Sequence, residues 1–201
     1  ERDATEQRFA LQGRLDLLRN ASEMLASLGM RASLRQVSDL LTREFADWCT
    51  LDVVEDGGGL VRATASAGNR RSHPGREPGD MLRDIAQSGK KLLIASVEDS
   101  DPRALEFPRE TASLVSVAVR GRGRPVGVLT CGRIAPASPY GADDVALLED
   151  LAARIGVSID RARLVREVEE RADAGRVLSY VADGVLLVDR TGLVRLWNPA
   201  A

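Results

Sequence analysis

The stretch VSVAVRGRGRPVGVL, residues 115–129, decides the fold of this chain. Val115, Val117 and Val119 alternate with small residues, which is typical of a strand with one buried face. The glycines of the RGRGR run at 120–124 supply a turn, and an apolar run then returns from Val126 to Arg133. The pattern therefore predicts two long antiparallel strands joined by a hairpin turn.

Helices and a second hairpin are predicted upstream of this stretch. Apolar residues at helical spacing predict a helix over 15–28, and Ser33 with Gln36 forms a capping box that predicts the start of a second helix. Over 49–54 the period changes to two, which predicts a strand that buries Cys49, Leu51 and Val53 and exposes its polar side. A DGGG turn then leads into a returning strand over 60–68.

The middle of the chain predicts a short helix between two polar loops. The loops cover 69–78 and 98–109, the helix covers 80–88 and ends at Gly89, and a strand follows over 92–97. Within the second loop, a helical turn is predicted around 104–107.

A long helix is predicted from about residue 141 to about residue 176. Its apolar residues recur in steps of three and four, close to the period of ~3.5 that suits a coiled-coil seam. Its second half is rich in Arg and Glu, which predicts a charged rod that pairs with a second copy of the chain. The predicted seam is Leu148, Leu151, Ile155, Ile159, Ala162, Val165, Val168 and Ala172.

Two of these stretches resemble the GAF domain family. Residues 115–129 are similar to the family's paired central strands, although Ala118-Val119 stands where the family usually has Pro-Leu, and ADDVALLEDLA at 142–152 is similar to its closing helix. The resemblance implies an α+β fold in which helices flank an antiparallel sheet. It also implies a ligand site between the sheet and the two loops, where Phe107 is the aromatic pocket candidate; the cofactor or ligand itself is unknown.

The C-terminal stretch DGVLLVDRTGLVRLWNPAA, residues 183–201, has two apolar runs around a DRTG turn. It resembles the opening of a PAS domain, which implies a piece of a longer bacterial signalling protein with an incomplete PAS hairpin at its end. We therefore expect four segments: an N-terminal helical extension (1–13), a GAF domain (14–159), a signalling helix (160–177) and a truncated PAS start (178–201). We also expect the apolar hairpin residues to be disordered or to lie on a partner's surface.

Composition excludes several classes of function. The net charge of −2 offers no field for nucleic acid, and no apolar run approaches the ~20 residues that span a bilayer, so we expect a cytoplasmic protein. His73 is the only histidine and Cys49 and Cys131 the only cysteines, which disfavours a metal site, a bilin attachment or a catalytic triad.

These observations predict a regulatory module rather than an enzyme. We expect it to bind a small ligand or partner, and to relay the change through a dimeric helix to an output domain such as a histidine kinase, a Ser/Thr phosphatase or a diguanylate cyclase. Two alternatives stay open: a ligand-free GAF dimerisation scaffold, and a GAF-type methionine sulfoxide reductase, which would need reactive cysteines in loops.

Overall fold

The computed structural model describes residues 2–27, 30–68, 77–97, 107–179 and 186–197. The chain divides into two compact units, Glu1–Asp160 and Arg161–Ala201, and one helix runs from the first into the second. In chain order the elements are α1 (Arg2–Ser27), α2 (Met30–Glu44), β1 (Trp48–Val54), β2 (Leu60–Ala67), α3 (Asp80–Ser88), β3 (Leu92–Ile94), β4 (Thr111–Arg120), β5 (Pro125–Ile134), α4 (Ala142–Ser179), β6 (Leu186–Val188) and β7 (Val194–Trp197).

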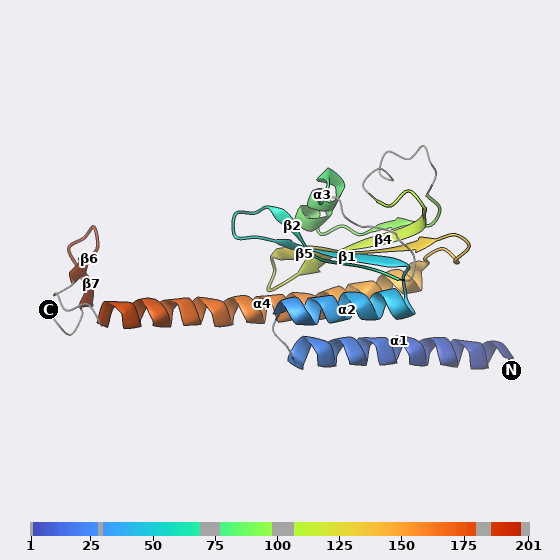
Figure 1. Ribbon diagram of the computed structural model, residues 1–201, viewed down its shortest axis with the longest axis horizontal. Helices are drawn as coiled ribbons and strands as arrows, with labels where there is room; N and C mark the ends of the chain where they lie inside the picture. The colour runs from blue at the N-terminus through green and yellow to red at the C-terminus, as the bar shows by residue number, and fades with distance from the viewer. Residues whose placement is uncertain (1, 28–29, 69–76, 98–106, 180–185, 198–201) are drawn as a thin grey trace. The chain divides into compact units, whose positions relative to one another are not determined.

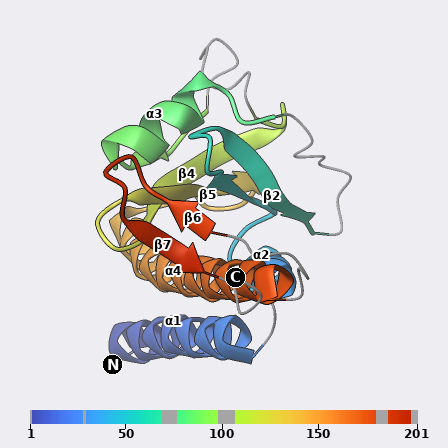
Figure 2. The ribbon, with the colours of Figure 1, turned by 90° about the vertical axis from the view of Figure 1, so that its left-hand side faces the viewer.

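A five-stranded antiparallel sheet forms the centre of the first unit, in the order β2-β1-β5-β4-β3. The predicted hairpin is confirmed, since β4 and β5 pair along their whole length. Helices α1, α2 and the first part of α4 lie on one face of the sheet, and α3 lies on the other (Figure 1 and Figure 2). The α+β fold with helices on both faces is therefore the one that the sequence predicts.

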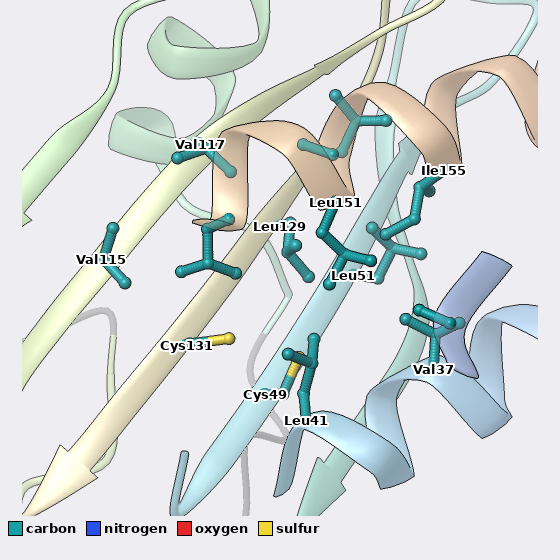
Figure 3. Packing of buried hydrophobic residues seen from close by; sticks show 14 of the residues in the cluster. Val37, Leu41, Cys49, Leu51, Val115, Val117, Leu129, Cys131, Leu151 and Ile155 are labelled. Carbon is teal, nitrogen blue, oxygen red and sulfur yellow. The ribbon is translucent and has the colours of Figure 1, made fainter. Parts of the chain in front are cut away.

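The larger core lies between the sheet and α1, α2 and α4. Leu51 of β1, Leu129 of β5 and Leu151 of α4 meet there, and each is almost completely buried (Figure 3). Apolar contact of this kind is the main favourable term in folding, at about 25 cal/mol for each Å² removed from water. This core fixes the first part of α4 against the sheet.

Helices α1 and α4 run side by side in the same direction. Arg14, in the middle of α1, pairs with Asp143, at the start of α4, at 3.2 Å. Further along, Arg154 Nη1 donates to Ser22 Oγ at 2.7 Å, so the contacts advance together along the two helices. Helix α1 also continues without a break through residues 2–13 of the predicted N-terminal extension.

Two local predictions are wrong. The second helix begins at Met30 rather than after Ser33, so Ser33 is a buried residue inside α2 and not its cap. The strand predicted over 92–97 ends at Ile94. At Ser33, burial in the core overrides the local capping signal. The helical turn predicted around 104–107 lies almost entirely outside the described residues.

The second unit holds the end of α4 and a two-stranded hairpin. The predicted strand–turn–strand is confirmed: Leu187 pairs with Leu196, and Asp189 Oδ1 accepts the backbone N–H groups of Thr191 and Leu193 at 2.9 and 3.1 Å. Gly192 completes the turn with a φ of 86°, which favours glycine. Val194 is exposed in this hairpin, and its burial on a partner's surface stays a prediction.

Candidate functional site

Hydroxyl groups form a row across the three central strands on the α3 face of the sheet. Thr130 of β5 stands opposite Thr50 of β1 on one side and opposite Ser116 of β4 on the other. Residues directly opposite each other point to the same face of a sheet. We call Thr50, Thr130 and Ser116 the hydroxyl row; all three are buried.

This burial contradicts the prediction that the polar side of β1 is exposed. Helix α3 and the strands around it cover that side with a second apolar cluster, which includes Leu82 and Ile85 of α3 and Val128 of β5. Both faces of β1 are therefore buried. Its alternating side chains point into two different apolar clusters, rather than into one core and into solvent.

One member of the hydroxyl row makes no hydrogen bond of standard geometry within the described part of the chain. The Ser116 and Thr130 hydroxyls are bonded to each other at 3.0 Å. The Thr50 hydroxyl is buried beside the Asp52 carboxylate, whose charged form it helps to stabilise, but it makes no hydrogen bond of standard geometry within the described residues. Leaving a buried hydroxyl unbonded costs about 1–3 kcal/mol.

A buried ion pair adjoins the row. Arg62 of β2 binds the Asp52 carboxylate with two hydrogen bonds, Nε to Oδ1 at 2.7 Å and Nη2 to Oδ2 at 3.3 Å. Burial raises the pKa of Asp52 above its ordinary 3.8, and Arg62 opposes this rise. The Asp52 side chain has no exposed surface, whereas that of Arg62 is 20% exposed. The two charges offset each other, so this end of the site is polar without a net charge.

Two stacked aromatic rings stand on the other side of the row. The Trp48 and Phe107 ring centres are 5.6 Å apart with 25° between the planes, and the Trp48 indole N–H donates to Thr111 Oγ1 at 3.1 Å. Gly132 faces Trp48 across the β1–β5 pair, and a Cβ there would overlap the indole ring. Phe107, the pocket candidate, is thus buried on the same face as the hydroxyl row.

Helix α3 covers this face because its sequence is amphipathic. Leu82, Ile85 and Ala86 point into the cluster, and the charged residues point outward. Gly89 ends the helix with a φ of 70°, and its N–H donates to the Ile85 carbonyl at 3.0 Å. The predicted helix and its glycine stop are both confirmed.

The predicted helix seam is divided by the fold. Leu148, Leu151, Ile155 and Ile159 are fully buried in the core of the first unit, so they are not available to a second copy of the chain. Ala162 is half-buried, Val165 and Val168 are exposed, and the Ala172 side chain lies outside the description. A repeat of three and four residues suits packing within a domain and packing between copies equally well. The sequence pattern therefore placed core residues and exposed residues of α4 in one predicted seam.

The two cysteines face each other across β1 and β5 in the larger core (Figure 3). Both are free and buried in strands, as the sequence predicts. Burial raises the pKa of Cys131 well above its ordinary value, so the thiol stays protonated and unreactive. The methionine sulfoxide reductase alternative needs reactive cysteines in loops, whereas these two cysteines are buried in strands.

His73 and most of both loops lie outside the described residues. Within the described ranges, no three acidic, histidine or cysteine side chains gather into a metal-binding group. None of the described helices combines the length and hydropathy needed to cross a bilayer.

A family model for the GAF domain matches residues 17–159. The chain belongs to the GAF domain family. The match covers the sheet, both of its apolar clusters and the buried part of α4. GAF domains are sensory and regulatory modules of signalling proteins, so the regulatory class predicted from the sequence is supported.

Solved structures share this fold at low sequence identity. The GAF domain of a phosphoenolpyruvate-protein phosphotransferase from Coxiella burnetii is 18% identical, with a TM-score of 0.60, over 78% of this chain and 98% of that one. The GAF domain of a protein assigned as a sensor histidine kinase from Pseudomonas syringae pv. tomato is 16% identical, with a TM-score of 0.60, over 82% and 99%. Free methionine-R-sulfoxide reductase from Neisseria meningitidis is 19% identical, with a TM-score of 0.61, over 76% and 91%. No curated protein matches the sequence significantly.

Sequence reasoning missed most of this GAF site. Trp48, Thr50 and Asp52 alternate along one strand, and that spacing was itself a signal that they share a face. The sequence does not reveal how β5 pairs with β1 and β4, and it is this register that places Thr130 and Ser116 beside them.

Proposed function

We propose that this GAF domain is the sensory module of a bacterial signalling protein that binds a small molecule on the α3 face. The observation that carries the proposal is the buried Thr50 hydroxyl, which makes no hydrogen bond of standard geometry within the described residues. It lies between a neutralised ion pair and an aromatic stack, an arrangement suited to a molecule with a polar edge and an apolar body. Phe107 would contact the apolar part.

Native mass spectrometry of the freshly purified 201-residue chain tests ligand binding. We expect a population heavier than the 21.7 kDa chain by the mass of one small molecule. Thr50→Val keeps the shape of the side chain and removes the hydroxyl, so we expect this variant to lose most of the bound mass. Ser88→Ala, at the exposed end of α3, is the matched control and should keep it. A clean unliganded mass for the unmodified chain would favour the dimerisation scaffold instead.

We propose further that α4 passes the signal to a second sensory module, a PAS domain that begins with the β6–β7 hairpin. Beyond the buried residues, α4 presents Leu164, Val165 and Val168, which are 42%, 51% and 64% exposed. Leu164 and Val168 lie four residues apart and so share a face of the helix. Ion pairs Arg166–Glu170 and Glu167–Arg171 at 2.7 and 2.6 Å accompany them. This pattern supports pairing with a second copy of the chain.

Light scattering after size exclusion tests the dimer. We expect the unmodified chain to elute at twice 21.7 kDa. Leu164→Glu with Val168→Glu places four carboxylates in the seam and should weaken dimerisation by at least about tenfold, or ~1.4 kcal/mol. Ala146→Glu with Ala153→Glu adds the same charge at exposed positions of α4 and should leave the dimer intact. A monomer for the unmodified chain at high concentration would rule out the dimeric relay.

A further inference from the structure

One face of α4 contacts the β4–β5 hairpin and the segment that follows α3. Glu149, Gly156 and Asp160 are spaced by seven and four residues, so they lie along one stripe of the helix. Each of them contacts the end of β4, the β4–β5 turn or the connection that follows α3. Asp160 is also the last residue of the first unit.

At Gly156 the backbone of β4 touches the backbone of α4. A Cβ at this position would overlap the Arg120 carbonyl oxygen, so only glycine permits the approach. Arg120 is the final residue of β4 and pairs with Pro125 at the start of β5. The end of the central hairpin therefore rests directly on the helix.

At Asp160 a buried carboxylate holds the turn of that hairpin. Asp160 Oδ2 accepts the Arg122 backbone N–H at 2.6 Å, and Asp160 Oδ1 lies 3.6 Å from Arg124 Nη2. Asp160 is only 6% exposed. A Cβ at Gly121 would overlap its carboxylate. The turn has no room to slide along α4 without breaking these contacts.

The same two elements reach the C-terminal end of α3. The Arg120 guanidinium fills the space beside Gly89, the residue that ends α3, so that a Cβ on Gly89 would overlap Nη1. Two residues later, Lys91 Nζ pairs with Glu149 Oε2 of α4 at 3.0 Å. The end of α3, the helix that covers the hydroxyl row, is therefore linked to α4 by the Arg120 side chain at one point and by the Lys91–Glu149 pair at the other.

We propose that Gly89, Lys91, Arg120, Gly156 and Asp160 form the joint through which movements of α3 reach α4. Arg120 contacts both ends of the route: its guanidinium lies beside Gly89 at the end of α3, and its backbone carbonyl lies against Gly156 of α4, so a shift of α3 is passed to α4 through this one residue. Asp160 keeps the turn against the helix at the residue where α4 leaves the first unit. The proposal rests on the proposed sensory function, and it names the route that links ligand site and helix.

Hydrogen exchange of the ligand-free 201-residue chain tests the joint. Asp160→Ala removes the acceptor for the Arg122 N–H and the pair with Arg124. We expect amide exchange to rise by about fivefold or more in the turn, residues 119–125, and also in α3, which Asp160 does not contact. Asp160→Asn keeps an acceptor oxygen and should give a smaller rise in amide exchange in both segments. This variant can still be measured if the alanine variant folds poorly. Asp150→Ala, at an exposed position of α4, should change neither.

The outcomes separate the joint from the sensory function. Faster exchange in the turn with α3 unchanged in both Asp160 variants would overturn the joint, even if native mass spectrometry finds a ligand. Faster exchange in both segments with a clean unliganded mass would keep the joint and remove the sensory function.

Discussion

Replacing Trp48 by alanine is expected to lower the free energy of unfolding by about 4 kcal/mol. The side chain is fully buried, stacks on Phe107 and donates a hydrogen bond to Thr111. Its removal leaves a large cavity between the sheet and α3 and deprives the Thr111 hydroxyl of its donor. Urea unfolding followed by far-ultraviolet circular dichroism measures the change without using the deleted fluorophore.

The conservative variant divides this loss into its parts. Trp48→Phe keeps an aromatic ring against Phe107 and loses the N–H, so we expect a loss of about 1–2 kcal/mol. A loss below about 1 kcal/mol for the alanine variant would mean that the α3 face is loosely packed, contrary to its burial.

Replacing Arg62 by alanine is expected to cost about 3 kcal/mol at neutral pH, because it leaves the fully buried Asp52 carboxylate without its cation. The reverse change, Asp52→Ala, should cost less, since Arg62 is partly exposed and its guanidinium can reach water. The double variant should be more stable than Arg62→Ala alone. Urea unfolding of the three variants and the parent forms a double-mutant cycle. Equal losses for the two single variants would contradict this account.

The same pair makes stability depend on pH. The folded-state pKa of Asp52 is raised above 3.8 by burial, so the unfolded chain loses the Asp52 proton at lower pH than the folded chain does. The contribution of Asp52 to stability therefore falls as pH rises from about 4 through the folded-state pKa. Without Arg62 that pKa rises further, so in Arg62→Ala the fall should extend to higher pH. Adding Asp52→Asn to Arg62→Ala should remove the extra pH dependence, which unfolding measurements between about pH 4 and 7 can check.

Much of the GAF fold was predictable because its signals are local. Alternating valines predict β4, glycines predict the turn that follows, and Gly89 predicts the end of α3. The buried hydroxyls were not predictable in this way. A strand with Thr50 and Asp52 on one side has the pattern of a half-exposed strand, and only the fold shows that α3 and the Trp48–Phe107 stack cover that side.

The joint was unpredictable for a related reason. Gly156 and Asp160 stand inside a helix whose apolar repeat dominates the pattern, and neither residue signals its partner. Gly121 and Gly123 were interpreted as turn residues, and the positive φ of 84° at Gly123 agrees with that role. That the turn also contacts α4 depends on how the sheet packs against the helix, which local sequence does not encode.

The buried pair of thiols has a practical consequence for spectroscopy. Both cysteines of the chain lie in the core, and burial keeps the Cys131 thiol protonated. A cysteine introduced at Val157 or Val168, both exposed on α4, can therefore be spin-labelled without first removing the native residues. In the proposed dimer, the distance between the spin labels on the two copies would measure the separation of the paired helices. The interior of each GAF domain would remain unchanged.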